Sequence, residues 1–561
     1  MTSIKSYNKR YENMKTERST YMPLWRELSD YHLANRGRFL VSDRNKANKR
    51  NTRQVNNTSH LSARTLASGM MAGITSPSRP WFRLGTTDDR LSESAAVKQW
   101  LHDVQTVMYS VFAASNTYTS LHALYGELGV FGTSAMGVFE DFENVIRCKT
   151  YTVGSYAIAL NGEDLVDTFY REYQLTVAQC VKEFGLKNCS QSVQEQWSKG
   201  NTENWITVMF LIEPNDDRDN NSPLARDLPF RAAYYEVNNE SRPNQVNSSN
   251  NDQFLKQSGF NEFSVLTPRW DVVGEDVYAS DCPGMTTLGD TKSLQLGAKR
   301  LYQAVDKVVS PPLQGPSELR NKINGHHLKP NEIVYTTGDN KLDTIYKFQP
   351  DLNAIESVNN EAENRIQRGF YEDLFLMLAN SDRRQITARE VAEKHEEKLL
   401  MLGPVLERLH TELLGPLIDR TFNILQRGGV LPPPPEELQN VELNVEYVSV
   451  LAQAQRLVSL GSLERLSGYV ASLSEIWPEA RNKFDAAQSI DDYSEALGTN
   501  PKVVRSDDDA EALTEADRQA AAQAQAAEQA QVMADVAKTA SDTDINDENA
   551  LGRTLSNAGL T

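Results

Sequence analysis

The stretch DTKSLQLGAKRLYQAVDKVVS (residues 290–310) decides the fold that we predict for this chain. Its apolar residues recur at intervals of 4, 3, 4 and 3 positions, the spacing of one face of an α-helix. They are Leu294, Ala298, Leu301, Val305 and Val308. At about 100° per residue, three lysines fall within roughly 80° of one another on the opposite side. These are Lys292, Lys299 and Lys307.

A second helical pattern begins near Asp351 and continues to residue 378, about 40 Å at the usual rise of about 1.5 Å per residue. Its apolar residues are Leu352, Ile355, Val358, Ala362, Ile366, Phe370, Leu374 and Leu378. Pro311 and Pro312 end the first helix, and a segment with Gly, Pro and a short strand-like run, EIVYTT, fills the gap. The sequence therefore predicts two helices flanking a compact insert, 311–350.

A third helix is predicted after the polar loop ANSDRRQ (379–385). Thr387 and Glu390 have the spacing of a capping box, in which each side chain bonds a free backbone amide of the first turn. The pattern runs to about residue 427, where Gly428 and Gly429 end it. Two prolines inside the helix should kink it, Pro404 and Pro416.

The rest of the chain mixes helices and strands. Residues 59–74 and 94–126 have helical patterns, whereas 147–160, 205–214 and 441–450 alternate like strands. Short helices are expected over 452–497, and the Ala/Gln/Asp-rich segment 506–549 is either a surface helix or a disordered tail. The predicted fold class is therefore α+β and predominantly helical.

The charge of the chain is uneven. The 561 residues carry a net charge of −18, which argues against a protein that coats nucleic acid. Residues 1–53 contribute +8 and residues 507–548 contribute −10. The basic loop 36–53 is either a nucleic-acid arm or a surface that packs on an acidic neighbour. The lysine face of 290–310 and the pair Arg383-Arg384 would be ordinary solvated surface in a monomer.

Several function classes lack their motifs. The chain has no P-loop, no GxSxG and no HExxH, since His395-Glu396 is not followed by the second histidine. We therefore predict no enzyme, no metal and no cofactor. No run of apolar residues is long enough for a membrane span, and the N-terminus has no signal peptide. The four cysteines form no CxxC pair and are predicted to be reduced thiols.

Three separated blocks resemble one known family. They are GMMAGITSPSRPWFRL (69–84), YGELGVFGTSAMGVFED (125–141) and ITAREVAEKHEEKLLMLGPVLERLHTELLGPLIDRTFNIL (386–425). Together with the helix–insert–helix order between the second and third, they resemble the head-to-tail connector, or portal, protein of short-tailed bacteriophages. The resemblance covers roughly residues 5–450, and the acidic tail beyond about 500 is covered least.

The resemblance implies a portal-type fold that assembles into a dodecameric ring at one capsid vertex. It divides the chain into an α/β wing (1–285), stem helices (286–310 and 351–378), a clip (311–350), a tunnel loop (379–386), a long kinked helix with a wing strand (387–450), a crown (451–505) and an acidic tail (506–561). Double-stranded DNA would pass through the channel during packaging and ejection, without sequence-specific contacts.

The resemblance also implies site residues and partners. Tunnel-loop side chains would face the DNA, namely Ser381, Arg383, Arg384 and Gln385, and Lys292, Lys299 and Lys307 of the stem would line the channel. The clip would contact the large terminase subunit and then the tail adaptor through Glu318, Arg320, Lys322, His326, His327 and Lys329. Further implied partners are the major capsid, scaffolding and internal core proteins, with no membrane insertion. The chain would assemble in the host cytoplasm and reside in the virion.

Two other hypotheses remain. One is a tail adaptor or internal virion protein without a DNA channel, which the long run of helices disfavours because adaptors of short-tailed phages are shorter chains. The other is a DNA-packaging enzyme, which the missing P-loop disfavours.

Overall fold

The computed structural model describes most of the chain and divides it into two compact units. Unit 1 comprises Met1–Thr87 and Trp100–Val458, and unit 2 comprises Asp88–Gln99 and Ser459–Thr561. The described residues are 3–42, 54–86, 94–220, 222, 224–237, 254–309, 313–314, 343–344, 351–375, 402–435, 438, 443–447, 465–474, 507–541 and isolated positions between 476 and 493.

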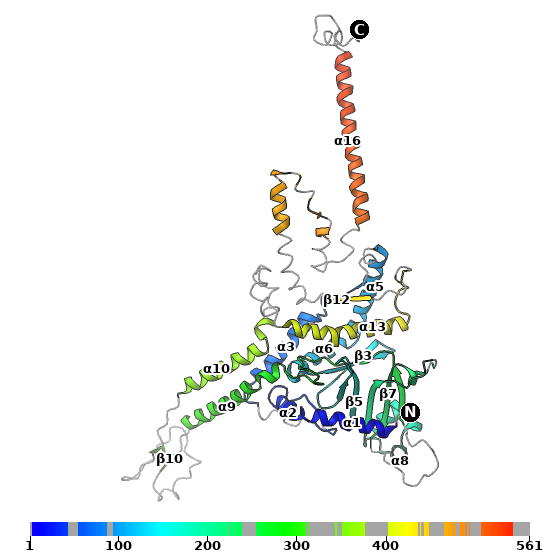
Figure 1. Ribbon diagram of the computed structural model, residues 1–561. Coiled ribbons are helices and arrows are strands. Elements are labelled where there is room, and N and C mark those ends of the chain that lie inside the picture. The colour runs from blue at the N-terminus through cyan, green and yellow to red at the C-terminus, as the bar shows by residue number, and fades with distance from the viewer. Residues whose placement is uncertain are drawn as a thin grey trace. The chain divides into compact units, whose positions relative to one another are not determined.

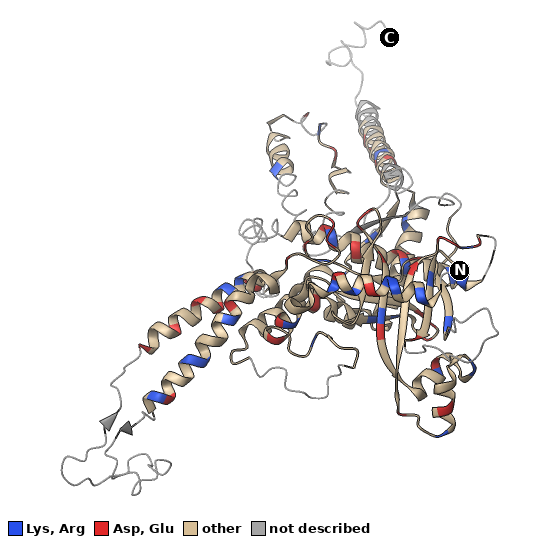
Figure 2. Cartoon of the chain, turned by 60° about the horizontal axis from the view of Figure 1, so that its bottom comes forward, with Lys and Arg blue, Asp and Glu red and all other residues tan. Residues whose placement is uncertain are grey.

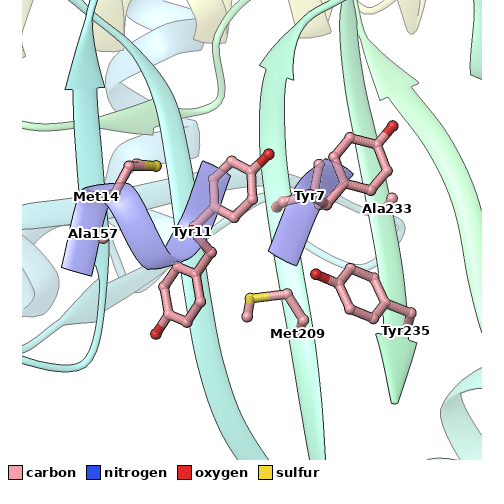
Figure 3. Close-up of a cluster of buried hydrophobic side chains, with 9 residues drawn as sticks. Tyr7, Tyr11, Met14, Ala157, Met209, Ala233 and Tyr235 are labelled. Atoms are coloured by element: carbon pink, nitrogen blue, oxygen red, sulfur yellow. The ribbon is translucent and has the colours of Figure 1, made fainter. Parts of the chain in front are cut away.

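A five-stranded antiparallel sheet forms one part of unit 1 (Figure 1). Its strands, in spatial order, are β4 (Ala157–Leu160), β5 (Val166–Thr176), β6 (Trp205–Pro214), β7 (Phe230–Glu236) and β8 (Lys256–Phe260). The first helix, α1 (Ile4–Ser19), lies across one face of this sheet, as Figure 3 shows. Its buried residues recur every three or four positions and contact the strands; they are Tyr7, Tyr11 and Met14.

The opposite face of the five-stranded sheet is covered by two other groups of elements. One is the three-stranded sheet of β3 (Val145–Tyr151), β2 (Ala135–Asp141) and β9 (Val265–Leu266). The Tyr151 ring of β3 lies 5.1 Å from that of Phe169 on β5. The other group is α7 (Val177–Phe184) and α8 (Gln191–Ser198), which share a buried cluster with Val208 of β6. The short turn η2 (Leu186–Asn188) connects them and has no buried residue. A further short turn, η3, is Ala225–Asp227.

The helical layer of unit 1 contains α2 (Met22–Tyr31), α3 (Thr58–Ile74) and α6 (Thr117–Phe131), while α5 (Ala95–Ala114) precedes α6. We predicted one helix over 94–126, but the chain turns at Asn116. The side chain of Asn116 donates to the carbonyl of Cys148 and accepts from its amide, at 2.7 and 2.9 Å. That pairing fixes the start of α6. The predicted strand 441–450 is β12 (Leu443–Tyr447), antiparallel to β1 (Phe82–Thr86).

The two long helices predicted around the insert are α9 (Pro283–Val309) and α10 (Leu352–Gly369). They run side by side (Figure 1), and β10 (Leu313–Gln314) pairs with β11 (Asp343–Thr344). The second helix ends earlier than we predicted, because Tyr371 has a φ of 54° and a helical turn resumes only at residue 372. The Tyr371 ring stacks on Trp270, with centroids 6.4 Å apart.

The third helix is described from Leu402 onward, so the predicted capping box at Thr387 and Glu390 lies outside the described residues. From Leu402 the chain forms first an α-helical stretch, then a π-helical turn (η6, His410–Leu414), and then α13 (Gly415–Arg427). The π turn stands directly before Pro416, whose missing amide cannot continue the regular ladder. The predicted kink at Pro416 stays a prediction beside this π turn, and residues 402–409, which include Pro404, are regular α-helix. The helix ends before Gly428 and Gly429, as predicted.

In unit 2, the acidic segment forms a single helix, α16 (Asp507–Ser541). Its described side chains are exposed except for the partly buried Ala510. Of the two alternatives for this segment, the surface helix is the one found for residues 507–541. In the predicted crown, residues 465–474 are helical.

Candidate nucleic-acid interface

The three lysines predicted on one helix face do lie on α9, but their surroundings differ. Lys299 and Lys307 are exposed on the outer half of the helix. Within the part of the chain that the structure describes, neither ammonium group has an ion-pair partner. Figure 2 colours the positions of basic and acidic residues along the chain, and both kinds occur on the two arm helices, α9 and α10. The outer half of α9 therefore has a net positive charge, because Lys299, Arg300 and Lys307 outnumber the exposed Asp306.

Lys292 is held by unit 1 itself. Its Nζ lies 2.6 Å from Oε2 of Glu27 on α2 and 5.9 Å from the centre of the Tyr31 ring. The side chain is only partly exposed. The sequence analysis grouped Lys292 with Lys299 and Lys307 because helical periodicity cannot reveal a partner 265 residues away. The structure separates it from them.

The apolar stripe of α9 is buried only near the start of the helix. Leu294 and Ala298 are buried, Leu301 is partly covered, and Val308 is 52% exposed. Tyr302 on the same outer half is 65% exposed. Because a helix face rich in apolar side chains is normally covered, the exposed Tyr302, Val305 and Val308 form an apolar surface that the described part of unit 1 leaves uncovered.

Close packing holds α9 against α10. Gly297 of α9 faces the buried Asn359 of α10 so closely that a β-carbon at this position would collide with the amide oxygen of Asn359. Nearer the base, the guanidinium of Arg365 lies 3.1 Å from Asp290. The two helices therefore form one arm, which we define as residues 283–309 and 351–369.

Hydrogen bonds fasten the base of the arm to the segment before α3. The Gln295 side chain accepts from the amides of Val55 and Asn56, at 2.6 and 2.9 Å, and donates to the carbonyl of Asn56 at 2.7 Å. The Asn56 side chain in turn donates to Glu363 of α10 at 2.6 Å. A polar side chain with three backbone partners is satisfied inside the protein, so this attachment is stable.

The start of the basic loop 36–53 packs on an acid, which fits one of the two readings of this loop. The Arg36 guanidinium lies 3.4 Å from the carboxylate of Glu127 on α6, which also accepts from the amide of Val153 at 3.2 Å. Burial raises the pKa of Glu127 to about 7, and the nearby Arg36 partly opposes that rise. Residues 43–53 lie outside the described residues.

A buried ion pair connects the third helix to the sheet region. Arg269 and Glu412, only 3% and 9% exposed, approach to 2.7 Å. The Glu412 carboxylate also accepts from the Arg269 amide and Nε, at 2.8 and 3.1 Å. Arg420 on α13 is buried as well and donates to the Val138 carbonyl at 2.8 Å, and burial lowers its pKa to about 10. The sequence analysis missed both arginines, because their partners are far away along the chain.

The remaining predicted site residues lie outside the described residues. These are Ser381, Arg383, Arg384 and Gln385 of the predicted tunnel loop, and Glu318, Arg320, Lys322, His326, His327 and Lys329 of the predicted clip. Among the residues that the structure does describe, no group of three or more His, Cys, Asp or Glu side chains is placed to hold a metal ion. In the same residues, no helix has the length and apolar character needed to cross a membrane.

Comparisons with known proteins identify the family of this chain. The model of the family described as "Bacteriophage head to tail connecting protein" matches residues 4–504. The probable portal protein of Bordetella phage BPP-1 is 42% identical over 547 residues, which cover 97% of this chain and 96% of that protein. The portal protein of Salmonella phage epsilon15 is 41% identical over 554 residues, 98% of each chain. This chain therefore belongs to the family of bacteriophage head-to-tail connecting proteins.

Proposed function

We propose that this chain is the portal subunit of a phage: twelve copies form a ring at one capsid vertex, and double-stranded DNA passes through its centre. The observation that carries this proposal is the outer half of α9, where exposed apolar residues and exposed lysines occur on one helix. Two portal proteins that are more than 40% identical over nearly the whole chain support it.

The exposed apolar residues favour self-association. Val305, Val308 and Tyr302 lie on the part of the arm that the body of unit 1 does not cover. Fully burying an exposed valine contributes about 1.5 kcal/mol or more, and Val305 and Val308, 40% and 52% exposed, would gain roughly half of that each. In a ring, the arms of neighbouring copies would cover these residues. A closed ring has no unpaired copy at either end, so every subunit gains the same contacts.

The exposed lysines fit a passage for DNA of any sequence. Ammonium groups attract phosphates without reading bases. Lys299 and Lys307, repeated around a ring, would form sparse bands of positive charge rather than a continuous basic surface. Sparse bands guide the duplex without tight binding, which suits DNA that has to slide. Arg383 and Arg384 of the predicted tunnel loop would add a constriction, and Lys292, paired with Glu27, would serve mainly to fix the arm.

The insert between the arm helices is the proposed contact for other phage proteins. Residues 311–350 would bind the large terminase subunit during packaging and the tail adaptor afterwards. Unit 1 would face the major capsid and scaffolding proteins, and α16 would lie towards the interior of the head. We place the ring in the virion, after assembly in the host cytoplasm.

Ring formation is tested by negative-stain microscopy and native mass spectrometry of the purified chain. We expect closed rings with a central hole, and a reduced ring fraction for Val305→Ser/Val308→Ser. Monomers or open filaments of the wild-type chain would refute the ring. Assaying the same preparation for ATPase and nuclease activity tests the rival proposal of a packaging enzyme.

The channel is tested by charge reversal. Lys299→Glu/Lys307→Glu should leave rings intact and lower the yield of DNA-filled heads. The matched control is Lys5→Glu/Lys9→Glu, which reverses two exposed charges of α1. Equal yields from both variants would contradict a channel role for α9. Arg383→Ala/Arg384→Ala should alter DNA retention after packaging, and normal yields of stable filled heads would count against the tunnel loop.

Deletion of residues 318–345 tests the insert. The shortened chain should form rings that no longer bind terminase or adaptor in a pull-down. If binding is retained, the insert is not the contact.

A further inference from the structure

Two of the four cysteines lie against each other in unit 1. Cys180 is on the buried side of α7, and Cys189 directly follows η2. Their Sγ atoms are 3.8 Å apart, both side chains are fully buried, and both are in the thiol form. The other two cysteines have different neighbours, since the Sγ of Cys148 lies 3.4 Å from the Thr117 hydroxyl and that of Cys282 donates to a backbone carbonyl.

Local sequence keeps the two sulfur atoms together. Thr176 and Gln179 form a capping box that fixes the start of α7. Gly185, with a φ of 83°, reverses the chain after α7 in a conformation that favours glycine. The Cys189 carbonyl accepts from the side chain of Gln194, and the Ser190 amide donates to Glu236 of β7. The backbone on both sides of the pair is therefore anchored.

We propose that Cys180 and Cys189 are a redox-modification site, in which a peroxide converts the two thiols to a disulfide. Hydrogen peroxide first oxidises one thiol to a sulfenic acid and releases water. The sulfur of the other cysteine then attacks the sulfenic sulfur, the S–S bond forms, and a second water leaves. Overall, two thiols and one hydrogen peroxide give one disulfide and two waters. Two electrons pass from the sulfurs to the peroxide oxygens.

The geometry needs only a small adjustment. A disulfide has an S–S distance of about 2.0 Å, so the two sulfur atoms, now 3.8 Å apart, have to approach by about 1.8 Å. The bond would tie α7 to the start of α8. A chain that is made in a reducing cytoplasm and released into an oxidising medium would meet both redox conditions. The chemistry itself does not depend on the ring proposed above.

The reaction is expected to be slow at neutral pH and faster in alkali. Burial raises the pKa of both thiols, and the thiolate is the reactive form. Glu236 of β7 disfavours a negative charge on both sulfur atoms, and Glu183 of α7 disfavours it on Cys180. Alkaline pH therefore favours the link.

The full-length protein is incubated with hydrogen peroxide, unfolded with iodoacetamide present, digested with trypsin without reduction, and analysed by mass spectrometry. Cleavage after Arg171, Lys182, Lys187 and Lys199 places each cysteine in its own peptide, 172–182 and 188–199. We expect these peptides to become joined, to separate again after dithiothreitol, and to form faster at pH 9 than at pH 7. Cys148 and Cys282 should stay alkylated.

Two variants complete the test. Cys148→Ser should leave the joined peptides unchanged, whereas Cys180→Ser should abolish them and leave Cys189 as a sulfenic acid or alkylated thiol. The proposal is overturned if peroxide leaves both peptides separate and alkylated, if it carries either cysteine to sulfinic acid instead, or if Cys180 or Cys189 joins another cysteine. Because the readout is on the wild-type chain, a folding defect of one variant cannot obscure the answer.

Discussion

Replacing Arg269 by methionine should weaken the attachment of the third helix to the sheet region and destabilise residues 402–427. Arg269 spans three chain segments, because its guanidinium bonds Glu412 on the π turn and the carbonyls of Asp276 and Asp164 at 3.2 and 2.8 Å. Methionine fills most of the space of the aliphatic part of the arginine side chain but carries no charge. The Glu412 carboxylate then stays buried with the Arg269 backbone amide as its remaining partner at this position.

The expected magnitude follows from burial. Removing one partner of a buried ion pair costs about 3–5 kcal/mol, because the other charge is left desolvated without its counter-charge. In hydrogen exchange, that loss corresponds to roughly 100- to 4000-fold faster exchange of amides protected by the local structure. The peptides to follow cover residues 402–427. Mass-spectrometric hydrogen exchange at fixed protein concentration keeps any assembly equilibrium constant.

The matched control is Arg365→Met, which removes ion pairs to Asp290 and Glu361. Arg365 is about half exposed, and such pairs are worth about 1 kcal/mol or less. Arg269→Met/Glu412→Leu should recover part of the loss, because it removes the unpaired charge as well. Wild-type exchange of residues 402–427 in Arg269→Met would refute this reasoning, as would an equal effect of Arg365→Met.

Three further predictions concern stability, each measured by urea unfolding. Burial raises the pKa of Glu127 to about 7, above its usual 4.5, so the folded protein binds more protons than the unfolded chain between these values and loses stability as pH rises through this range. Glu127→Gln should remove about 2–3 kcal/mol of that loss between pH 5 and pH 8. An unchanged dependence of the unfolding free energy on pH would contradict this prediction. Gly297→Ala should destabilise the protein by about 1–3 kcal/mol, because the new methyl group collides with Asn359. Gly289→Ala meets no neighbour and should stabilise the protein by about 1 kcal/mol. If both variants change stability in the same direction, this packing argument is excluded. Val145 has a φ of 66°, which is strained for a β-branched residue. Val145→Asn should therefore raise the free energy of unfolding by about 1 kcal/mol. A lower urea midpoint for this variant would show that the backbone is not strained there.

Local patterns predicted the elements well where the residues that make them are close in sequence. The spacing of Leu294 and Ala298 identified α9, and the two glycines after Arg427 marked the end of α13. The alternation in 205–214 predicted β6 with the same bounds. Helical and strand periodicity and terminal signals depend on neighbouring residues alone, which is why the sequence suffices for them.

The same patterns failed where a distant contact intervenes. The second arm helix has an apolar pattern that continues past Gly369, yet Tyr371 leaves the helical region and stacks on Trp270, about one hundred residues earlier. The break between α5 and α6 is likewise fixed by Asn116 bonding to the backbone of Cys148. Local propensity is a weak preference that a buried tertiary contact overrides.

By itself, the sequence determined the α+β class, the helix–insert–helix arm and, through three separated blocks, the family. The tertiary structure decided which charges are available. It paired Lys292 with Glu27 while leaving Lys299 and Lys307 exposed, buried Arg269 against Glu412, and placed Cys180 beside Cys189. The physical reason is that the properties of a charge or a thiol depend on its neighbours and on its exposure to water. Those neighbours come from segments that the fold brings together, and periodicity along the chain contains no record of them.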